Sequence, residues 1–280
     1  MQIPTLTDTQ QCAENALTQH FPGHDAKFLR DMFALIGPLF AGQYPGFQAC
    51  DCPFHDLTHT LQATLALARL LDGHIRSGAA PTLTARDVEL AIAGILLHDS
   101  GYFKETGDNE GTGAKFTPIH VGRSAAFAAR CLPAFGVQPD EVRIVQNAIH
   151  STGADVRMAR LAFRNDRERF IGCALGTADI LGQMAAADYP ERLPGLYREF
   201  NESALMAAPD SNTLVLYASA KDLMRRTRRF YTVNVQQMLD KEWSGVHRAY
   251  AHHFRDGTNQ YFAAIETNLN RIDDILSAAR

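Results

Sequence analysis

The chain has 280 residues, of which 46% are hydrophobic and 21% are charged, the balance of an ordinary globular protein with a substantial buried core. Its formal net charge of −4 gives no general reason to expect nucleic-acid binding, so a phosphate-bearing substrate would need local positive charge, most simply from bound cations. The five cysteines include no CxxC pair, which argues against a disulfide framework and a structural zinc site and favours a reducing cytosol.

The N-terminus shows no signal peptide, because it lacks a basic region followed by an apolar core. No stretch approaches the roughly 20 apolar residues that cross a bilayer, so we expect a cytoplasmic protein without a membrane partner. Cys50 and Cys52 form a CxC pair that could be a soft metal site, but without a second pair we interpret it as incidental. A homo-oligomer is compatible with the sequence.

The hydrophobic pattern is helical almost throughout, with no convincing alternating strand, and predicts one continuous all-α unit over residues 1–280. Thr84 with Asp87 forms a capping-box pattern, Thr117-Pro118 and Pro139 are typical helix starts, and Gly73 is a typical stop. Proline-rich and glycine-rich interruptions at 188–212 predict a break in the helices. In chain order the expected helices are 8–20, 26–41, 55–71, one that opens at 84, 117–129, 139–150, 168–187, 213–242 and 259–279.

The pair His98-Asp99, at the end of the apolar run LAIAGILLHDSGY, can offer a metal ion both an imidazole nitrogen and a carboxylate oxygen. His55 and His59 are four residues apart and share one helix face, so that one can bind a metal while the other reaches a substrate on it. Asp179 lies mid-helix among small and apolar residues, where an ionised carboxylate needs a partner or a cation.

His120 and His150 each lie near a helix end that can converge on the same cavity. Each of them alone is also compatible with an ordinary core or surface role, and Asp179 alone is compatible with a cap or an ion pair. The stronger indication of a metal site is that the candidate ligands follow one another along the chain in an ordered series, with a predicted helix between each position and the next. We interpret four further histidines as ordinary: His74, His247, His252 and His253.

The order His59, His98-Asp99, Asp179 resembles the H…HD…D signature of the HD-domain metal-dependent phosphohydrolase superfamily. With His120 and His150 included, it resembles the H…HD…H…H…D subset, which holds two metals. The segment FHDLTHT is similar to the HNxxH element of the cyclic nucleotide phosphodiesterase branch, with Asp56 where that branch has asparagine. The resemblance covers roughly residues 50–185. It implies an HD-domain helical bundle at about 50–187, with accessory helices at 1–49 and 188–280.

The resemblance also implies a role for each matching residue. His59, His98, Asp99 and Asp179 would bind the first metal, and Asp99 would bridge to a second metal held by His120 and His150. His55 matches the position that protonates the leaving oxygen in the phosphodiesterase branch, although some relatives use that position as a ligand. The HD-GYP group has a lysine where this chain has Tyr102, and no glutamine matches the purine clamp of cyclic nucleotide phosphodiesterases.

Imidazole and carboxylate ligands suit manganese, iron, cobalt or zinc better than calcium, so we expect one or two such cations, with magnesium an alternative at the second site. Cations of this kind activate water for attack on phosphorus, and a protonated His55 would support the departing alkoxide. Loop 105–116 lies between two ligand-bearing segments and is either an active-site lid or a solvent loop. Three nearby cations are candidates for holding the substrate phosphate, or else solvated surface charges: Lys104, Lys115 and Arg123.

The sequence therefore predicts a metal-dependent phosphohydrolase, with His55 and Asp99 catalytic, that cleaves a phosphomonoester or phosphodiester of a small, nucleotide-like partner. Two alternatives stay open: a mixed-valent di-iron oxygenase with the same ligands, and a non-catalytic module that senses a metal or nucleotide. The basic run MRRTRRF is interpreted as one charged helix face rather than a binding site for an anionic partner, and it contains Arg225, Arg226, Arg228 and Arg229.

Overall fold

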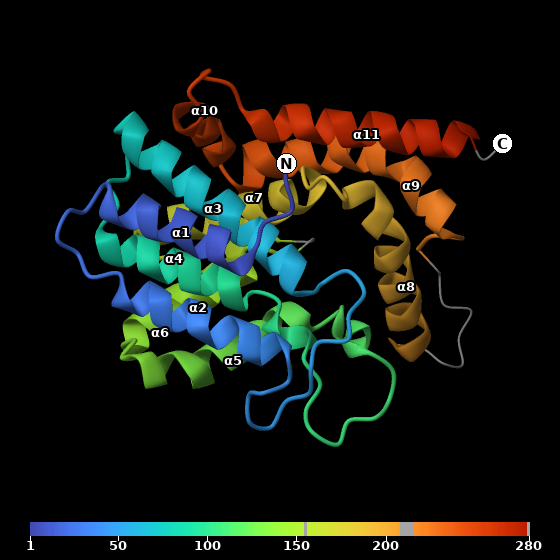
Figure 1. The fold of residues 1–280 in the computed structure, drawn as a ribbon, viewed down its shortest axis with the longest axis horizontal. Helices are drawn as coiled ribbons and strands as arrows, with labels where there is room; N and C mark the ends of the chain where they lie inside the picture. The colour runs from blue at the N-terminus through green and yellow to red at the C-terminus, as the bar shows by residue number, and fades with distance from the viewer. Residues whose placement is uncertain (154–155, 208–215, 279–280) are drawn as a thin grey trace.

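The computed structural model describes residues 1–153, 156–207 and 216–278. Within these ranges the chain forms eleven α-helices and several short 3₁₀ and π turns but no strand, so the all-α prediction is confirmed (Figure 1). The helices are α1 Leu6–Thr18, α2 Lys27–Phe40, α3 Leu57–Ser77, α4 Ala85–Leu97, α5 His120–Cys131, α6 Pro139–His150, α7 Asp166–Met184, α8 Tyr189–Ala207, α9 Ala220–Arg229, α10 Tyr250–His253 and α11 Gln260–Ala278.

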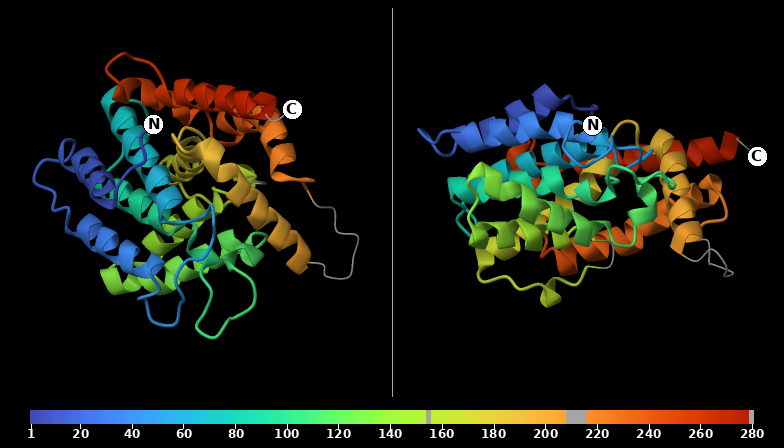
Figure 2. Two further views of the ribbon diagram at one scale, coloured as in Figure 1. Left: turned by 45° about the vertical axis from the view of Figure 1, so that its right-hand side comes forward. Right: turned by 90° about the horizontal axis from the view of Figure 1, so that it is seen from below.

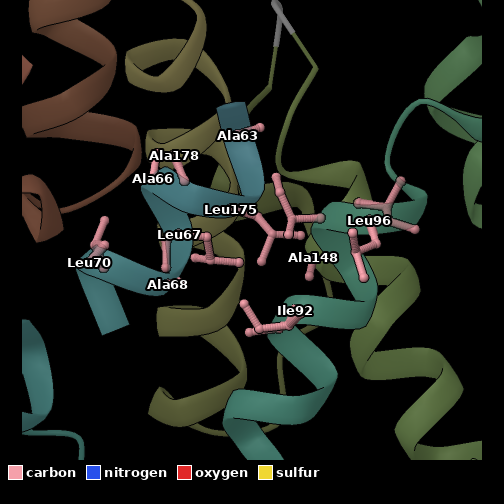
Figure 3. Packing of buried hydrophobic residues seen from close by; sticks show 14 of the residues in the cluster. Ala63, Ala66, Leu67, Ala68, Leu70, Ile92, Leu96, Ala148, Leu175 and Ala178 are labelled. Carbon is pink, nitrogen blue, oxygen red and sulfur yellow. The ribbon is translucent and has the colours of Figure 1, made fainter. Parts of the chain in front are cut away.

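The core is built around α3 and α7, which are buried along most of their length. Small residues allow close packing here, because a Cβ on Gly182 of α7 would lie 2.9 Å from the carbonyl oxygen of Gln62 on α3. Figure 3 shows alanines of α3 packed beside leucine and alanine side chains of α7, with α4 and α6 next to them. This close contact brings the first turn of α3 and the middle of α7 together, and both carry candidate ligands.

Local capping explains several helix starts that the sequence predicts. Thr84 and Asp87 form the expected capping box at α4, and Pro139 begins α6. The predicted stop of α3 at Gly73 is wrong, because α3 continues to Ser77 and ends at Gly78, which has a left-handed φ of 65°. Gly73 is instead a packing residue: a Cβ there would lie 2.1 Å from the carbonyl oxygen of Ala249.

The predicted break at 188–212 is also wrong in its first part, because α8 runs unbroken from Tyr189 to Ala207. Pro190 lies in the first turn, where a backbone N–H has no partner within the helix, and Pro194 removes only one further hydrogen bond. Residues 208–212 of this interruption lie outside the described residues, as do 213–215 of the predicted helix 213–242 and position 279 of the last helix.

The C-terminal part of the chain covers the core rather than forming a separate bundle. After α9 the chain continues through π turns at Phe230–Val235 and Met238–Glu242, and the buried indole of Trp243 then donates to the carbonyl oxygen of Ser151 at 3.1 Å. Asn268 of α11 donates to the carbonyl oxygens of Met184, the last residue of α7, and of Ala186, and Figure 2 shows α11 lying along one side of the molecule.

Asp72 of α3 lies far along the helix from the candidate ligands and joins three elements. Its carboxylate accepts hydrogen bonds from His20 at 2.7 Å, from Arg76 at 2.7 Å and from His253 of α10 at 2.7 Å. Burial alone would raise the pKa of Asp72, but these basic partners hold it well below its usual value. His253 therefore belongs to this structural network, in agreement with its interpretation as an ordinary histidine.

No single helix in the described ranges is long and apolar enough to cross a membrane, whereas α7 and α8, which meet at a bend of 112°, pass the same test of length and composition only as a pair.

Candidate metal centre

Helix termini supply most of the candidate ligands. His59 lies in the first turn of α3, where the side chain of Asp56 caps the helix by accepting a hydrogen bond from the His59 backbone N–H at 2.9 Å. His98 is the C-cap of α4, and Asp99 begins the short 3₁₀ turn η1, Ser100–Tyr102. Asp179 lies on α7. The first metal's predicted ligands therefore come from three elements that meet at one end of the core.

The ligand atoms of these four residues crowd together in the interior. The Nε2 of His59 lies 3.3 Å from the Nε2 of His98, 3.1 Å from Asp99 Oδ2 and 3.2 Å from Asp179 Oδ1. The Nε2 of His98 lies 3.2 Å and 3.4 Å from the same two carboxylate oxygens. His59, His98 and Asp99 are at most 3% exposed, so solvent does not separate these charges.

The spacing fits a shared cation better than a set of pairwise hydrogen bonds. Asp99 Oδ2 and Asp179 Oδ1 are buried but form no hydrogen bond of acceptable geometry with any described residue, although imidazole nitrogens lie close to both. A metal bound at about 2.0–2.2 Å separates neighbouring ligand atoms by about 3.0–3.5 Å. The observed 3.1–3.4 Å falls within that range.

Orientation of the imidazoles also suits metal binding. The Nδ1 of His98 hydrogen-bonds the carbonyl oxygen of Ile95 at 2.7 Å, which fixes the ring and turns Nε2 toward the cluster. His120, the first residue of α5, uses its Nδ1 in the same way on the carbonyl oxygen of Thr117 at 2.7 Å. Partners of this kind set the tautomer and the ring orientation of metal-ligating histidines.

Buried charge makes the cluster strongly coupled. Burial alone would lower the pKa of His59, but the adjacent carboxylates of Asp179 and Asp99 raise it to about 9. Burial would raise the pKa of Asp99, yet the His98 charge and the His59 contact hold it well below its usual value. Without a metal, two protons on imidazoles must balance the two carboxylates. A divalent cation could supply the same charge with the imidazoles neutral.

His120 and His150, the predicted ligands of a second metal, differ in placement. His120 Nε2 lies 3.8 Å from Asp99 Oδ1, the carboxylate oxygen that does not face His59 and His98. Burial lowers the pKa of both imidazoles, which favours their neutral, ligating form. His150 ends α6 and is half-buried, and in the described parts of the chain no hydrogen bond, ion pair or ring contact joins it to another candidate ligand. The structure therefore brings five of the six predicted ligands together, and His150 as a ligand stays a prediction.

His55 is held beside this cluster by a residue that the sequence analysis missed. One of its ring nitrogens belongs to a group, with His59 and Asp99, whose ligand atoms all lie within 4.8 Å of one another. Its Nδ1 hydrogen-bonds Glu199 Oε2, and Glu199 Oε1 accepts from the backbone N–H groups of Phe54 at 2.6 Å and His55 at 3.0 Å. The Glu199 side chain is fully buried.

The only sequence signal for Glu199 is its position on α8. It continues the buried face that begins with Leu193, a place where a carboxylate needs a partner. That partner lies 144 residues away along the chain, so the sequence gives no way to identify it.

Tyr102 packs beside two of the site imidazoles. Its ring stacks on His55 at 4.6 Å between ring centroids and on His120 at 4.5 Å, with interplanar angles of 15° and 19°. Burial and the nearby Asp99 raise its pKa well above the usual value, so its hydroxyl stays protonated. Tyr102 therefore supplies a rigid aromatic surface rather than a charge.

The three basic side chains predicted to hold a phosphate contact protein oxygens instead. Lys104 donates to Asp51 and to the carbonyl oxygen of Gly111, both at 2.8 Å. Lys115 pairs with Asp108, and Arg123 donates to the carbonyl oxygens of Gly101 in η1 and of Phe103 directly after it. Their role in substrate binding stays a prediction.

Hydrogen bonds attach loop 105–116 to two neighbouring parts of the chain, one near each end of the loop. Gln48 donates to the carbonyl oxygens of Glu105 and Asp108, so the loop lies beside segment 41–56, as both views in Figure 2 and Figure 1 show. Near its other end Thr112 donates, through its hydroxyl, to Glu202 of α8 at 2.7 Å. Glu202 follows Glu199 by one turn. The lid function of this loop stays a prediction.

The basic run on α9 lies on the surface and is partly paired. Arg226 contacts Asp222 at 2.9 Å, and Arg228 contacts Glu266 and Asp273 of α11 at 2.8 Å each. These contacts agree with its interpretation as a charged helix face.

A comparison with curated proteins gave no match. The family model described as Npun_R2479-like matches residues 40–273, a range that includes all the candidate ligands as well as α8 with Glu199. Because this match spans most of the chain, the protein belongs to the Npun_R2479-like family.

Proposed function

We propose that the protein is a metal-dependent phosphohydrolase that cleaves a phosphomonoester or phosphodiester of a small, nucleotide-like molecule. The observation that carries this proposal is the buried set of His59, His98, Asp99 and Asp179, in which two carboxylate oxygens lie among imidazole nitrogens and accept no hydrogen bond from the described part of the chain. The order of these residues along the chain, which resembles the HD-domain signature, supports the same assignment.

The donor set fits a transition metal. Two neutral imidazoles and two carboxylates suit manganese, iron, cobalt or zinc. His59, His98, Asp99 and Asp179 would hold one such cation, and the second oxygen of Asp99 with His120 would begin a second site. When bound, such cations lower the pKa of a coordinated water and neutralise charge on a phosphate oxygen.

The chain's own residues supply the proton. Glu199 accepts from the Nδ1 of His55, so the tautomer is fixed and the other ring nitrogen is the one available to a substrate. A protonated His55 can then donate to the oxygen that leaves phosphorus. Tyr102 holds the plane of the same ring by stacking.

The decisive experiment combines metal analysis with turnover. Purified protein should contain one or two transition-metal ions per chain and hydrolyse bis-p-nitrophenyl phosphate, whereas Asp179→Asn should lose metal and turnover together. Glu266→Gln changes an exposed carboxylate on α11 and is the matched control, which should keep both. Wild-type protein that holds no metal above a background level would refute the proposal.

The alternative chemistries give different outcomes in the same experiment. A di-iron oxygenase would hold two irons, change its visible spectrum on exposure to oxygen and leave phosphate esters intact. A non-catalytic module would bind metal and turn over neither class of substrate. The His55–Glu199 pair favours hydrolysis, because a pure sensor has no use for an oriented proton donor.

A further inference from the structure

Two thiols that the proposed reaction does not use lie directly before His55. Cys50 is partly exposed and Cys52 is 6% exposed, and they are separated only by Asp51. Because the chain advances at most about 3.6 Å per residue, the Cα atoms of Cys50 and Cys52 are at most about 7 Å apart, close enough for the two sulfurs to meet after a small bend. The sulfur of Cys50 also donates to the carbonyl oxygen of His55 at 3.4 Å, so the segment curls back on itself.

Segment 50–55 contacts two other parts of the candidate site, Glu199 on α8 and loop 105–116. Two residues beyond Cys52, the backbone N–H groups of Phe54 and His55 begin to donate to Glu199. Between the thiols, Asp51 accepts from the backbone N–H of Gly113 at 2.7 Å, in loop 105–116. A Cβ on Gly113 would lie only 3.0 Å from the sulfur of Cys52, so that thiol packs against the same loop.

We propose that Cys50 and Cys52 are a redox modification site, which a peroxide converts to an intramolecular disulfide. The Cys50 thiolate attacks one oxygen of hydrogen peroxide, the O–O bond breaks, and Cys50 becomes a sulfenic acid while hydroxide leaves. The sulfur of Cys52 then attacks the Cys50 sulfur and displaces water. Two thiols lose two electrons in total, peroxide gains them, and the thiol protons end in water.

Position and exposure decide which thiol reacts first. Cys50 is accessible to a small oxidant, and Cys52 is buried beside it, which is the arrangement of a reactive cysteine with its resolving partner. The remaining cysteines, Cys12, Cys131 and Cys173, lie on α1, α5 and α7, and in the described ranges none contacts another thiol. A zinc site is the weaker interpretation, because two thiolates leave that metal two protein ligands short.

Disulfide formation changes the segment that carries His55. An extended chain separates the Cα atoms of residues i and i+2 by about 7 Å, whereas a disulfide needs about 4.4–6.8 Å. Closing the ring therefore bends the chain at Asp51, removes the Cys50 hydrogen bond to His55 and moves the Cys52 sulfur relative to Gly113. We expect the oxidised protein to lose turnover at least tenfold. This consequence rests on the proposed function, whereas formation of the disulfide does not depend on it.

The test begins with the fully reduced full-length chain and hydrogen peroxide. Free thiols should fall from five to three, because two of the five are consumed. The tryptic peptide 31–69 contains both cysteines and no other, so it should become lighter by two hydrogen atoms until a dithiol reductant is added. Cys50→Ser and Cys52→Ser should each form no internal disulfide, while Cys131→Ser, the matched control, should still lose two thiols.

Three outcomes would overturn the proposal: five thiols that survive peroxide, oxidation that falls on the other three cysteines, or a disulfide that joins two chains. Turnover is then measured on both forms. Loss in the oxidised wild type, recovery with reductant and resistance in Cys52→Ser would support a control of activity. If neither form turns over any phosphate ester, the proposed function fails, and the peptide mass still decides the modification site.

Discussion

Glu199→Gln separates the proton-donor role of His55 from metal binding. Glu199 is fully buried and accepts three hydrogen bonds, two from backbone N–H groups and one from the Nδ1 of His55. A glutamine keeps one oxygen for the backbone donors, but its NH₂ group faces His55 Nδ1 and cannot accept. The substitution therefore removes one charge-assisted hydrogen bond and preserves the shape of the site.

The expected loss follows from that one bond. A hydrogen bond to a charged group contributes about 1.5–3 kcal/mol, and each 1.36 kcal/mol corresponds to a tenfold change in rate. Turnover should fall about 10–150-fold for a substrate whose leaving alkoxide needs a proton. The unfolding free energy should change less, because the backbone N–H groups of Phe54 and His55 keep an acceptor. Glu199→Ala would leave both buried donors unpaired and cost about 1–3 kcal/mol for each.

The assay compares two leaving groups on wild type and Glu199→Gln. An alkyl phosphate ester should show the full loss, whereas a p-nitrophenyl ester, whose leaving group is stable as an anion, should show less than about a threefold loss. Metal content should equal that of wild type. An equal loss on both substrates would refute the role of Glu199 in orienting a proton donor, and loss of metal would make it a support of the metal centre instead.

Three further changes test other parts of the structure. Tyr102→Phe should keep turnover within about threefold, because the stacked ring remains. Tyr102→Leu should lower turnover about tenfold, since each ring stack contributes about 0.5–1.5 kcal/mol. Equal effects of the two substitutions in steady-state kinetics would contradict a positioning role. Gly176→Ala should lower the unfolding free energy by about 1–3 kcal/mol in urea titration, because its Cβ would lie 2.3 Å from the indole of Trp243. Asp72→Asn should lower the melting temperature at pH 7 but lower it less at pH 3. The pKa of Asp72 is depressed in the folded state, so its carboxylate stabilises the fold fully above the unfolded-state pKa of about 4. This stabilisation disappears as the pH falls toward the folded-state pKa. An identical difference at both pH values would show that charge is not the cause.

Residues whose partners are close in sequence were predictable. The capping box of Thr84 and Asp87 is local, and so is the pair His98-Asp99 at the end of an apolar helix. His59 was identifiable from its four-residue spacing to His55, but the predicted shared helix face is wrong, because α3 begins at Leu57 and His55 precedes it. From such local features, the sequence predicts the all-α class and most of the candidate ligands.

Long-range contacts decided what the sequence left undetermined. Gly73 and Gly78 are equally good helix stops by composition, and only the close approach of Ala249 makes Gly73 a packing residue. Pro194 suggested a break, but α8 accepts it at the cost of one hydrogen bond. Glu199 binds a segment 144 residues away, a pairing that no local pattern encodes.

Because α8 begins after residue 187, a fragment that stops at the boundary of the ligand-bearing bundle would keep every candidate metal ligand and lack Glu199. Such a fragment would leave the His55 imidazole without its anionic partner and Thr112 without Glu202. If the proposed function holds, α8 supplies the second half of the reaction centre, and insertions or fusions near α8 should disturb turnover as directly as changes among the ligands.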